Sequence, residues 1–240
     1  MSLDIYDLIN KIIKRYRIEF RSYELYEEIK QTIKEIATIL TQDAICSISF
    51  LFSDQNNNKE MCFLYMTMLK HILNIFYSLM FQDFPEFFED NLKAWMDILK
   101  GSLDFSVPLD NPYDLNLFLK VKKTAMRCLN LCCNNYSEDI VDYHNNFIQS
   151  VWNLVTLVKQ EDSYSKLVRE LLDYYKILFQ YNRSSGFNPD TIQHLINSLI
   201  IPNMTMTNKE LDEFEENAIN FLKVELEEAD MDSSKYFVYP

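Results

Sequence analysis

Hydrophobic residues recur at three- and four-residue steps along most of the chain, which is the spacing of one face of an α-helix. The first such stretch predicts a helix whose buried face is formed by Ile5, Leu8, Ile9, Ile12 and Ile13. Arg15 and Arg17 follow near the end of this helix. The pattern therefore predicts helical structure almost from the first residue.

A second helix is predicted to begin after Ser22, because serine is a favourable N-cap residue and glutamates follow it in the first turns. Its apolar stripe consists of Leu25, Ile29, Ile33 and Ile36. A third helical stretch is predicted to continue to about residue 52. Polar residues rich in asparagine at 54–59 then predict a flexible connecting loop.

The next helix is predicted over residues 61–81, and Pro85 marks the start of another, since proline suits a first helical turn. This second helix contains Trp95 and is predicted to end at Gly101. Residues 101–113 contain glycine, two prolines and several aspartates, which predicts a long flexible loop. Five further helices are predicted at 114–134, 137–159, 162–181, 189–200 and 208–228.

Helices that follow one another without strands place the chain in the all-α class, which also suits its two glycines and six prolines. A helix pair about every 40 residues matches the period of HEAT and armadillo solenoids, so the chain would hold about five or six antiparallel helix pairs. A compact helical bundle has the same periodicity. We expect one helical segment over residues 1–240.

The chain carries 36 acidic and 23 basic residues, and its net charge is −13. This charge repels a phosphate backbone, so nucleic acid is not an expected partner. Neither a signal peptide nor an apolar run near the ~20 residues of a membrane span is present. The five cysteines lack the spacing of a disulfide framework, which indicates a reducing compartment.

No arrangement of residues predicts catalysis or a bound cofactor. His71, His144 and His194 lie on separate helical patterns, and Cys128, Cys132 and Cys133 lack the further ligands of a zinc site. Glycine is too scarce for a phosphate-binding loop. We therefore expect no enzyme, no cofactor and no metal, and we interpret the cysteines as small buried hydrophobic residues.

Several acidic residues share the last predicted helix, where like charges repel unless a cation neutralises them. This repulsion makes the run a candidate partner-binding surface, although a solvated helix face has the same pattern. The residues are Glu210, Asp212, Glu213, Glu215 and Glu216.

Two long segments carry a family resemblance: YRIEFRSYELYEEIK at 16–30 and FYSLMFQDFPEFFEDNLKAWM at 76–96. Shorter segments follow in the same order at 148–155, 201–204 and 214–232. Together they resemble the importin-alpha re-exporter family of the importin-beta superfamily, also called the exportin-2 or cellular apoptosis susceptibility family. Residues 235–240 depart from the basic continuation typical of that family.

This resemblance implies a HEAT-repeat solenoid, and it implies that the sequence is a fragment from the N-terminal half of a longer carrier. In the family, importin-alpha and Ran-GTP bind the carrier cooperatively, and the complex moves between nucleus and cytoplasm. Nuclear pore proteins are further candidate partners. An alternative is a scaffold or adaptor of the armadillo type that binds basic peptides independently of Ran.

Overall fold

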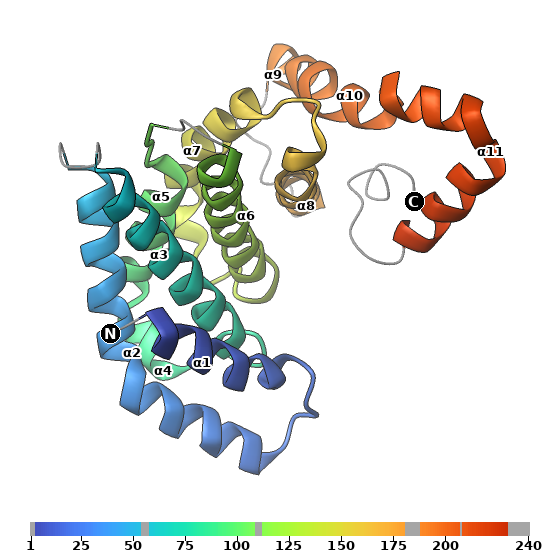
Figure 1. Cartoon of the computed structure of the whole chain (residues 1–240). Coiled ribbons are helices and arrows are strands. Elements are labelled where there is room, and N and C mark those ends of the chain that lie inside the picture. Colours follow the sequence, from blue (N-terminus) through green and yellow to red (C-terminus); the bar gives the residue numbers. More distant parts are fainter. Residues whose placement is uncertain (1–2, 54–57, 109–111, 181–187, 207, 230–240) are drawn as a thin grey trace. The chain divides into compact units, whose positions relative to one another are not determined.

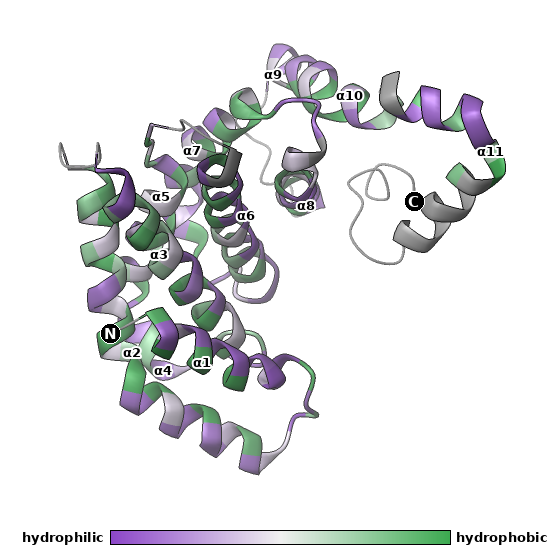
Figure 2. Cartoon of the chain, viewed as in Figure 1, coloured by the Kyte–Doolittle hydropathy of each residue, from purple (hydrophilic) through white to green (hydrophobic). Residues whose placement is uncertain are grey.

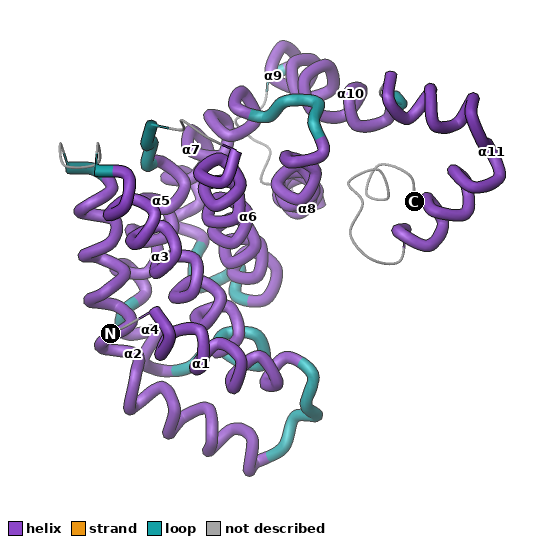
Figure 3. Tube along the Cα trace, in the orientation of Figure 1, coloured by secondary structure: helices purple, strands orange, loops and turns teal. Residues whose placement is uncertain are grey.

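The computed structural model describes residues 3–53, 58–108, 112–180, 188–206 and 208–229. Every regular element within these ranges is helical, as Figure 3 shows. The chain forms two compact units, residues 1–150 and residues 151–240, and each is described by itself. The predicted all-α class is confirmed for the part of the chain that the structure describes.

The first unit contains two layers of helices (Figure 1). One layer consists of α1 (Leu3–Ile13), α3 (Lys59–Leu79) and α6 (Pro112–Asn135), with α3 packed against both of the others. The second layer consists of α2 (Tyr23–Leu51) and α5 (Leu92–Asp104). Each of α2 and α5 also packs against the helix that follows it in the first layer, so the helices form stacked antiparallel pairs.

Helix α2 begins as predicted, because the Ser22 side chain accepts a hydrogen bond from the backbone amide of Leu25. It then continues as one helix to Leu51, where the sequence pattern predicted two. Figure 1 shows that α2 bends along its length. The Thr32 hydroxyl bonds the carbonyl of Glu28, and this type of bond within a helix favours bending.

Helix α1 exposes most of the face that its sequence pattern predicted to be buried. Ile5, Leu8 and Ile12 are 45%, 57% and 51% exposed, whereas Tyr6 and Ile13 are buried. The Tyr6 hydroxyl donates a hydrogen bond to the Asp43 carboxylate of α2, 2.5 Å away. Tyr6 lies outside the apolar stripe that predicted the buried face. A stripe that includes Tyr6 lies closer to the face that is buried in the structure.

Gly101 lies inside α5, which continues to Asp104, so the predictions that this glycine ends the helix and opens a loop were wrong. A Cβ atom added at Gly101 would lie 2.8 Å from Cγ2 of Ile48 on α2. The glycine therefore permits a close approach of α5 to α2. The predicted 101–113 loop shortens accordingly, since α6 already begins at Pro112.

The predicted 54–59 loop is also shorter, because Asn58 caps α3 and Lys59 begins it. Residues 54–57 and 109–111 lie outside the described residues. After α3, the short helix α4 (Glu86–Asp90) follows Pro85, so the predicted start is confirmed, but the single helix predicted from Pro85 to Gly101 is divided at Asn91 into α4 and α5. Its Phe88 packs with Phe76 and Trp95, whose rings stack with centroids 4.2 Å apart.

Lys122 of α6 is 1% exposed, which is unusual for a lysine. Its ammonium group donates hydrogen bonds to the carbonyls of Leu103 and Phe105, at 2.8 and 2.6 Å. The same group lies 3.7 Å from the ring centre of Phe105 and 4.7 Å from that of Phe118. Burial lowers the pKa of this lysine, and the bonds hold the end of α5 against α6.

The helix α7 (His144–Leu157) follows a 3₁₀ turn at Val141–Tyr143 and contains the boundary between the two units. The second unit continues with a 3₁₀ turn (Asp162–Tyr164) and α8 (Ser165–Gln180). Next come α9 (Pro189–Leu195), a π-helical turn (Ile196–Ile200) and α10 (Ile201–Met204). The π turn ends at Ile200, two residues before Pro202, which has no amide hydrogen to continue the regular α-helical ladder.

The last element, α11 (Asn208–Ala229), is interrupted by a non-helical backbone conformation at Asn217. Residues 230–240, with the predicted family departure at 235–240, lie outside the described residues. Within the described ranges no helix is both long and apolar enough to cross a membrane.

Candidate functional site

The five predicted acidic residues all lie in the first part of α11, before the interruption at Asn217. Figure 2 colours much of this part as hydrophilic. Four of them are exposed and Glu210 is half-buried. The structure therefore places the run on one accessible helical segment, and its role in partner binding stays a prediction.

The two segments that carry the family resemblance, 16–30 and 76–96, are held together by side-chain hydrogen bonds in the first unit. The Gln82 amide donates to the backbone carbonyls of Tyr16 and Glu19, at 2.8 and 3.0 Å. Its side-chain oxygen accepts a bond from Arg21 at 3.1 Å. Gln82 thus fixes the chain before α2 to the end of α3.

Arg17 makes a second connection between these segments. Its guanidinium donates to the Ser78 hydroxyl at 2.9 and 2.7 Å and to the Asn74 carbonyl at 3.2 Å. It also lies 4.8 Å from the ring centre of Tyr77. Burial lowers the pKa of Arg17, and the nearby charge of Arg127 lowers it further.

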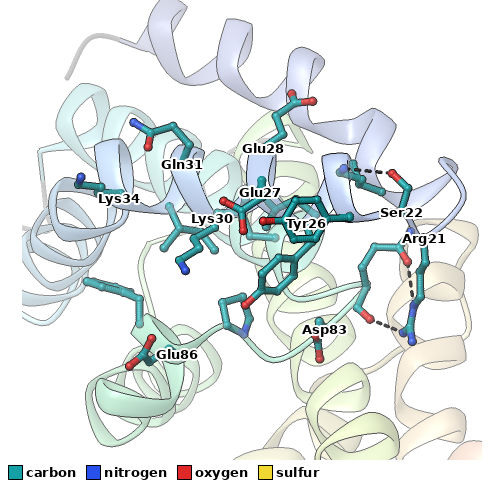
Figure 4. Close-up of a pocket in the computed structure, with 18 of the residues that line it drawn as sticks. Arg21, Ser22, Tyr26, Glu27, Glu28, Lys30, Gln31, Lys34, Asp83 and Glu86 are labelled. Carbon is teal, nitrogen blue, oxygen red and sulfur yellow. Dashed lines mark hydrogen bonds between the residues drawn. The ribbon is translucent and has the colours of Figure 1, made fainter.

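A groove of about 1150 Å³ opens between the first turns of α2 and the chain from the end of α3 through α4 (Figure 4). Its apolar lining includes Leu25, Ile29, Leu79 and Phe87. Tyr23 and Tyr26, which are 74% and 49% exposed, also line it. The segments at 16–30 and 76–96 supply most of both walls.

The α2 wall of the groove carries charges of both signs, since Glu27 and Glu28 also line it, and the opposite wall is acidic. Lys30 and Lys34 project from α2, and Asp83, Glu86 and Asp90 lie on the opposite wall. No ion pair between these walls occurs among the residues that the structure describes. Aromatic residues bordered by solvated charges of both signs are typical of a protein-binding surface.

The histidines are not arranged for catalysis. Asn10 lies within hydrogen-bond distance of the His71 ring, at 3.2 Å, and burial lowers the pKa of His71. His144 is buried on α7, and His194 contacts Ser198 within its own helical segment at 3.2 Å. His71 and His144 belong to the first unit and His194 to the second.

The three clustered cysteines are fully buried in α6, which confirms their interpretation as packing residues. Burial raises the pKa of Cys132 well above its ordinary value, so the thiol stays protonated. In the described portion of the chain, no three His, Cys, Asp or Glu side chains gather in a way that could hold a metal ion. The aromatic pair of Trp95 and Phe88 is also core, whereas Phe87 lines the groove.

Residues 12–237 match the family model described as Cse1. The chain belongs to the Cse1 family. This membership confirms the resemblance drawn from the sequence.

Relatives from animals and yeast match nearly the whole chain. Exportin-2 of Oreochromis niloticus is 30% identical over 238 residues, covering 94% of this chain and 24% of its own length. Exportin-2 of Homo sapiens is 29% identical with the same coverage. The importin alpha re-exporter of Saccharomyces cerevisiae is 28% identical over 237 residues, again covering 94% of this chain and 24% of its own.

A solved structure agrees with these matches. The exportin Cse1 in its cargo-free, cytoplasmic state superposes with a TM-score of 0.85 at 26% identity. The match covers 97% of this chain and 26% of that one. The chain therefore has the helical-repeat fold of a Cse1 exportin, and it spans about a quarter of the length of its relatives.

Sequence reasoning did not identify the groove or the hydrogen bonds of Gln82 and Arg17. Tyr23 and Tyr26 lie beside residues of the predicted buried stripe, so their exposure carries no distinct sequence signal. The resemblance at 16–30 and 76–96 was the available signal, because these two segments form the walls.

Proposed function

We propose that this chain is a segment of a nuclear export receptor that returns importin-alpha to the cytoplasm in a complex with Ran-GTP. The observation that carries the proposal is the Cse1 family match over residues 12–237. The yeast relative's name, importin alpha re-exporter, supplies the cargo. The receptor acts by binding proteins and shuttles between nucleus and cytoplasm.

A stacked helical-repeat architecture suits this mechanism. Each repeat contacts its neighbours, so small rotations between repeats add up to a large change in curvature. Cargo and nucleotide-bound Ran can then favour one curvature together, and hydrolysis of GTP removes the contacts that stabilise it. The receptor needs no catalytic group of its own for this cycle.

The acidic run of α11 and the groove of the first unit are the surfaces that we propose for partner contact. Four of the five acidic side chains are exposed, which leaves them accessible to a basic partner. The groove offers Tyr23 and Tyr26 as exposed aromatic side chains. Aromatic residues contribute strongly to protein-protein binding energy.

The test is a pull-down with the complete protein that contains this chain. Immobilised importin-alpha is incubated with that protein and with Ran loaded with GTP or with GDP. We expect retention with Ran-GTP only. Equal retention with Ran-GDP would contradict the proposal, and Ran-independent binding to a panel of basic peptides would support the scaffold alternative.

The α11 contact is tested in the same assay by replacing Asp212, Glu213, Glu215 and Glu216 with their amides. A matched control replaces four exposed acidic residues of other helices that do not line the groove, Glu24, Glu35, Glu60 and Glu89. If only the α11 variant loses retention on importin-alpha, the acidic run of α11 contacts a partner. If both variants are retained equally, the proposed α11 contact is wrong.

A further inference from the structure

Two neighbouring helices of the first unit carry cations without carboxylates over most of their length. Residues 61–81 of the α3 region include Lys70 and no aspartate or glutamate, and residues 115–135 of α6 include Lys120 and Arg127 and likewise none. These helices lie side by side in one layer. The local excess of positive charge contrasts with the net charge of −13 of the whole chain.

Cations of the two helices, together with Arg17 of the 3₁₀ turn after α1, lie in two pairs. Lys70 and Lys120 lie close enough that the charge of Lys120, after burial, lowers the pKa of Lys70. Seven residues further along each helix, Tyr77 on α3 meets Arg127 on α6, whose guanidinium carbon is 4.1 Å from the ring centre. Arg17 approaches the same ring to 4.8 Å. The two guanidinium carbons are thus no further apart than the sum of these distances.

These four side chains, Arg17, Lys70, Lys120 and Arg127, form what we call the basic seam. Within the ranges that the structure describes, none of them forms an ion pair, and the guanidinium of Arg127 lies over the Tyr77 ring. The Asp7 carboxylate raises the pKa of Lys70 through its charge, but it already forms an ion pair with Lys11 at 2.6 Å. The charges of the seam are therefore not neutralised within the first unit.

Arrangements of like charges that are partly withdrawn from water are unfavourable unless an anion compensates them. Arg17 and Arg127 are both half-buried, and among the described residues the Arg127 guanidinium donates no hydrogen bond to a protein acceptor. A carboxylate could accept two parallel hydrogen bonds from such a group. The side chains of the seam thus supply both charge and directed donors.

We propose that the basic seam between α3 and α6 is a docking surface for a carboxylate-rich segment of a protein partner. Two helical turns separate the two cation pairs, or about 10 Å along the axis. Acidic side chains three residues apart in a polyproline II segment lie on one face and span a similar distance, about 9 Å. Nucleic acid is the less favoured anion, because its continuous phosphate backbone would extend beyond the seam over the acidic remainder of the chain, whereas a short acidic segment need not. The assignment does not depend on the export-receptor proposal.

The test uses a fluorescein-labelled decaglutamate peptide and fluorescence anisotropy with the 240-residue chain at low salt. The seam variant is Lys120→Gln with Arg127→Gln. The control is Lys159→Gln with Lys176→Gln, which removes the same charge from two exposed lysines of the second unit. We expect about tenfold weaker binding for the seam variant and a change within about twofold for the control.

Arg127→Lys keeps the charge and removes the planar donor arrangement, so we expect an intermediate loss. Circular dichroism of every variant establishes that the helices are intact. Equal weakening in the seam and control variants, or absence of peptide binding to the wild type, would overturn the proposal. Tighter seam-dependent binding of a single-stranded oligonucleotide or of polyphosphate would overturn it in favour of a phosphate ligand.

Discussion

Replacing Gln82 with glutamate changes few atoms and reverses the hydrogen-bonding character of a connecting side chain. In the native protein the Gln82 amide donates to the carbonyls of Tyr16 and Glu19. A carboxylate at this position turns two donated bonds into two contacts between oxygen lone pairs. Its attraction to Arg21 offsets part of the loss.

The magnitude follows from these contacts. Each lost hydrogen bond destabilises the fold by about 1 kcal/mol, and the unpaired carbonyls add a comparable penalty. The exposed pair with Arg21 returns at most about 1 kcal/mol. We expect Gln82→Glu to lower the free energy of unfolding of the first unit by about 2–3 kcal/mol, which moves the urea midpoint by about 1 M.

The assay is urea denaturation followed by tryptophan fluorescence in a Trp152→Phe background. Trp95 then reports on the first unit, where it is 1% exposed and stacked on Phe76. Gln42→Glu on α2 is the matched control, because Gln42 is exposed and its replacement should change stability by less than about 0.5 kcal/mol. Equal midpoints for the Gln82 and Gln42 variants would refute the reasoning.

Three further predictions concern helix packing, capping and association. Gly101→Ala should destabilise the first unit by about 1 kcal/mol in urea denaturation, because the added methyl group would lie 2.8 Å from Cγ2 of Ile48. Increased stability would contradict this prediction and would mean that α2 moves aside readily. Ser22→Ala should cost about 1 kcal/mol by the same measurement, and Ser22→Asp should retain the cap; equal loss in both would contradict the capping role. At millimolar concentration the chain should self-associate weakly through exposed apolar residues such as Leu8. In sedimentation velocity, Leu8→Lys should weaken this self-association, and a strictly monomeric wild type would contradict the prediction.

The sequence predicted the helical class and most helix positions because apolar spacing is a local signal. Ser22 and Pro85 mark starts that depend on neighbouring backbone groups, and both were predicted correctly. Gly101 was misassigned because its role depends on Ile48, a residue more than fifty positions away in the chain. The buried face of α1 was missed for a similar reason, since Tyr6 is buried through its bond to Asp43.

The candidate sites were less predictable than the fold. The acidic run of α11 is visible in the sequence because its members are neighbours in one helix. The basic seam depends on how α3 and α6 align, and residues fifty positions apart give no sign of that alignment. The family resemblance identified the segments that form the groove, but the walls meet only through the long-range bonds of Gln82 and Arg17.

Because Lys122 is buried, the reactivity of its amine reports on motion inside the first unit. Its amine lies in the core against two carbonyls and two aromatic rings, out of reach of acylating reagents in solution. Modification of this lysine therefore requires the contact between α5 and α6 to separate. The rate at which Lys122 is acylated, read by peptide mass spectrometry, measures how often these neighbouring helices part while the surface lysines react at once.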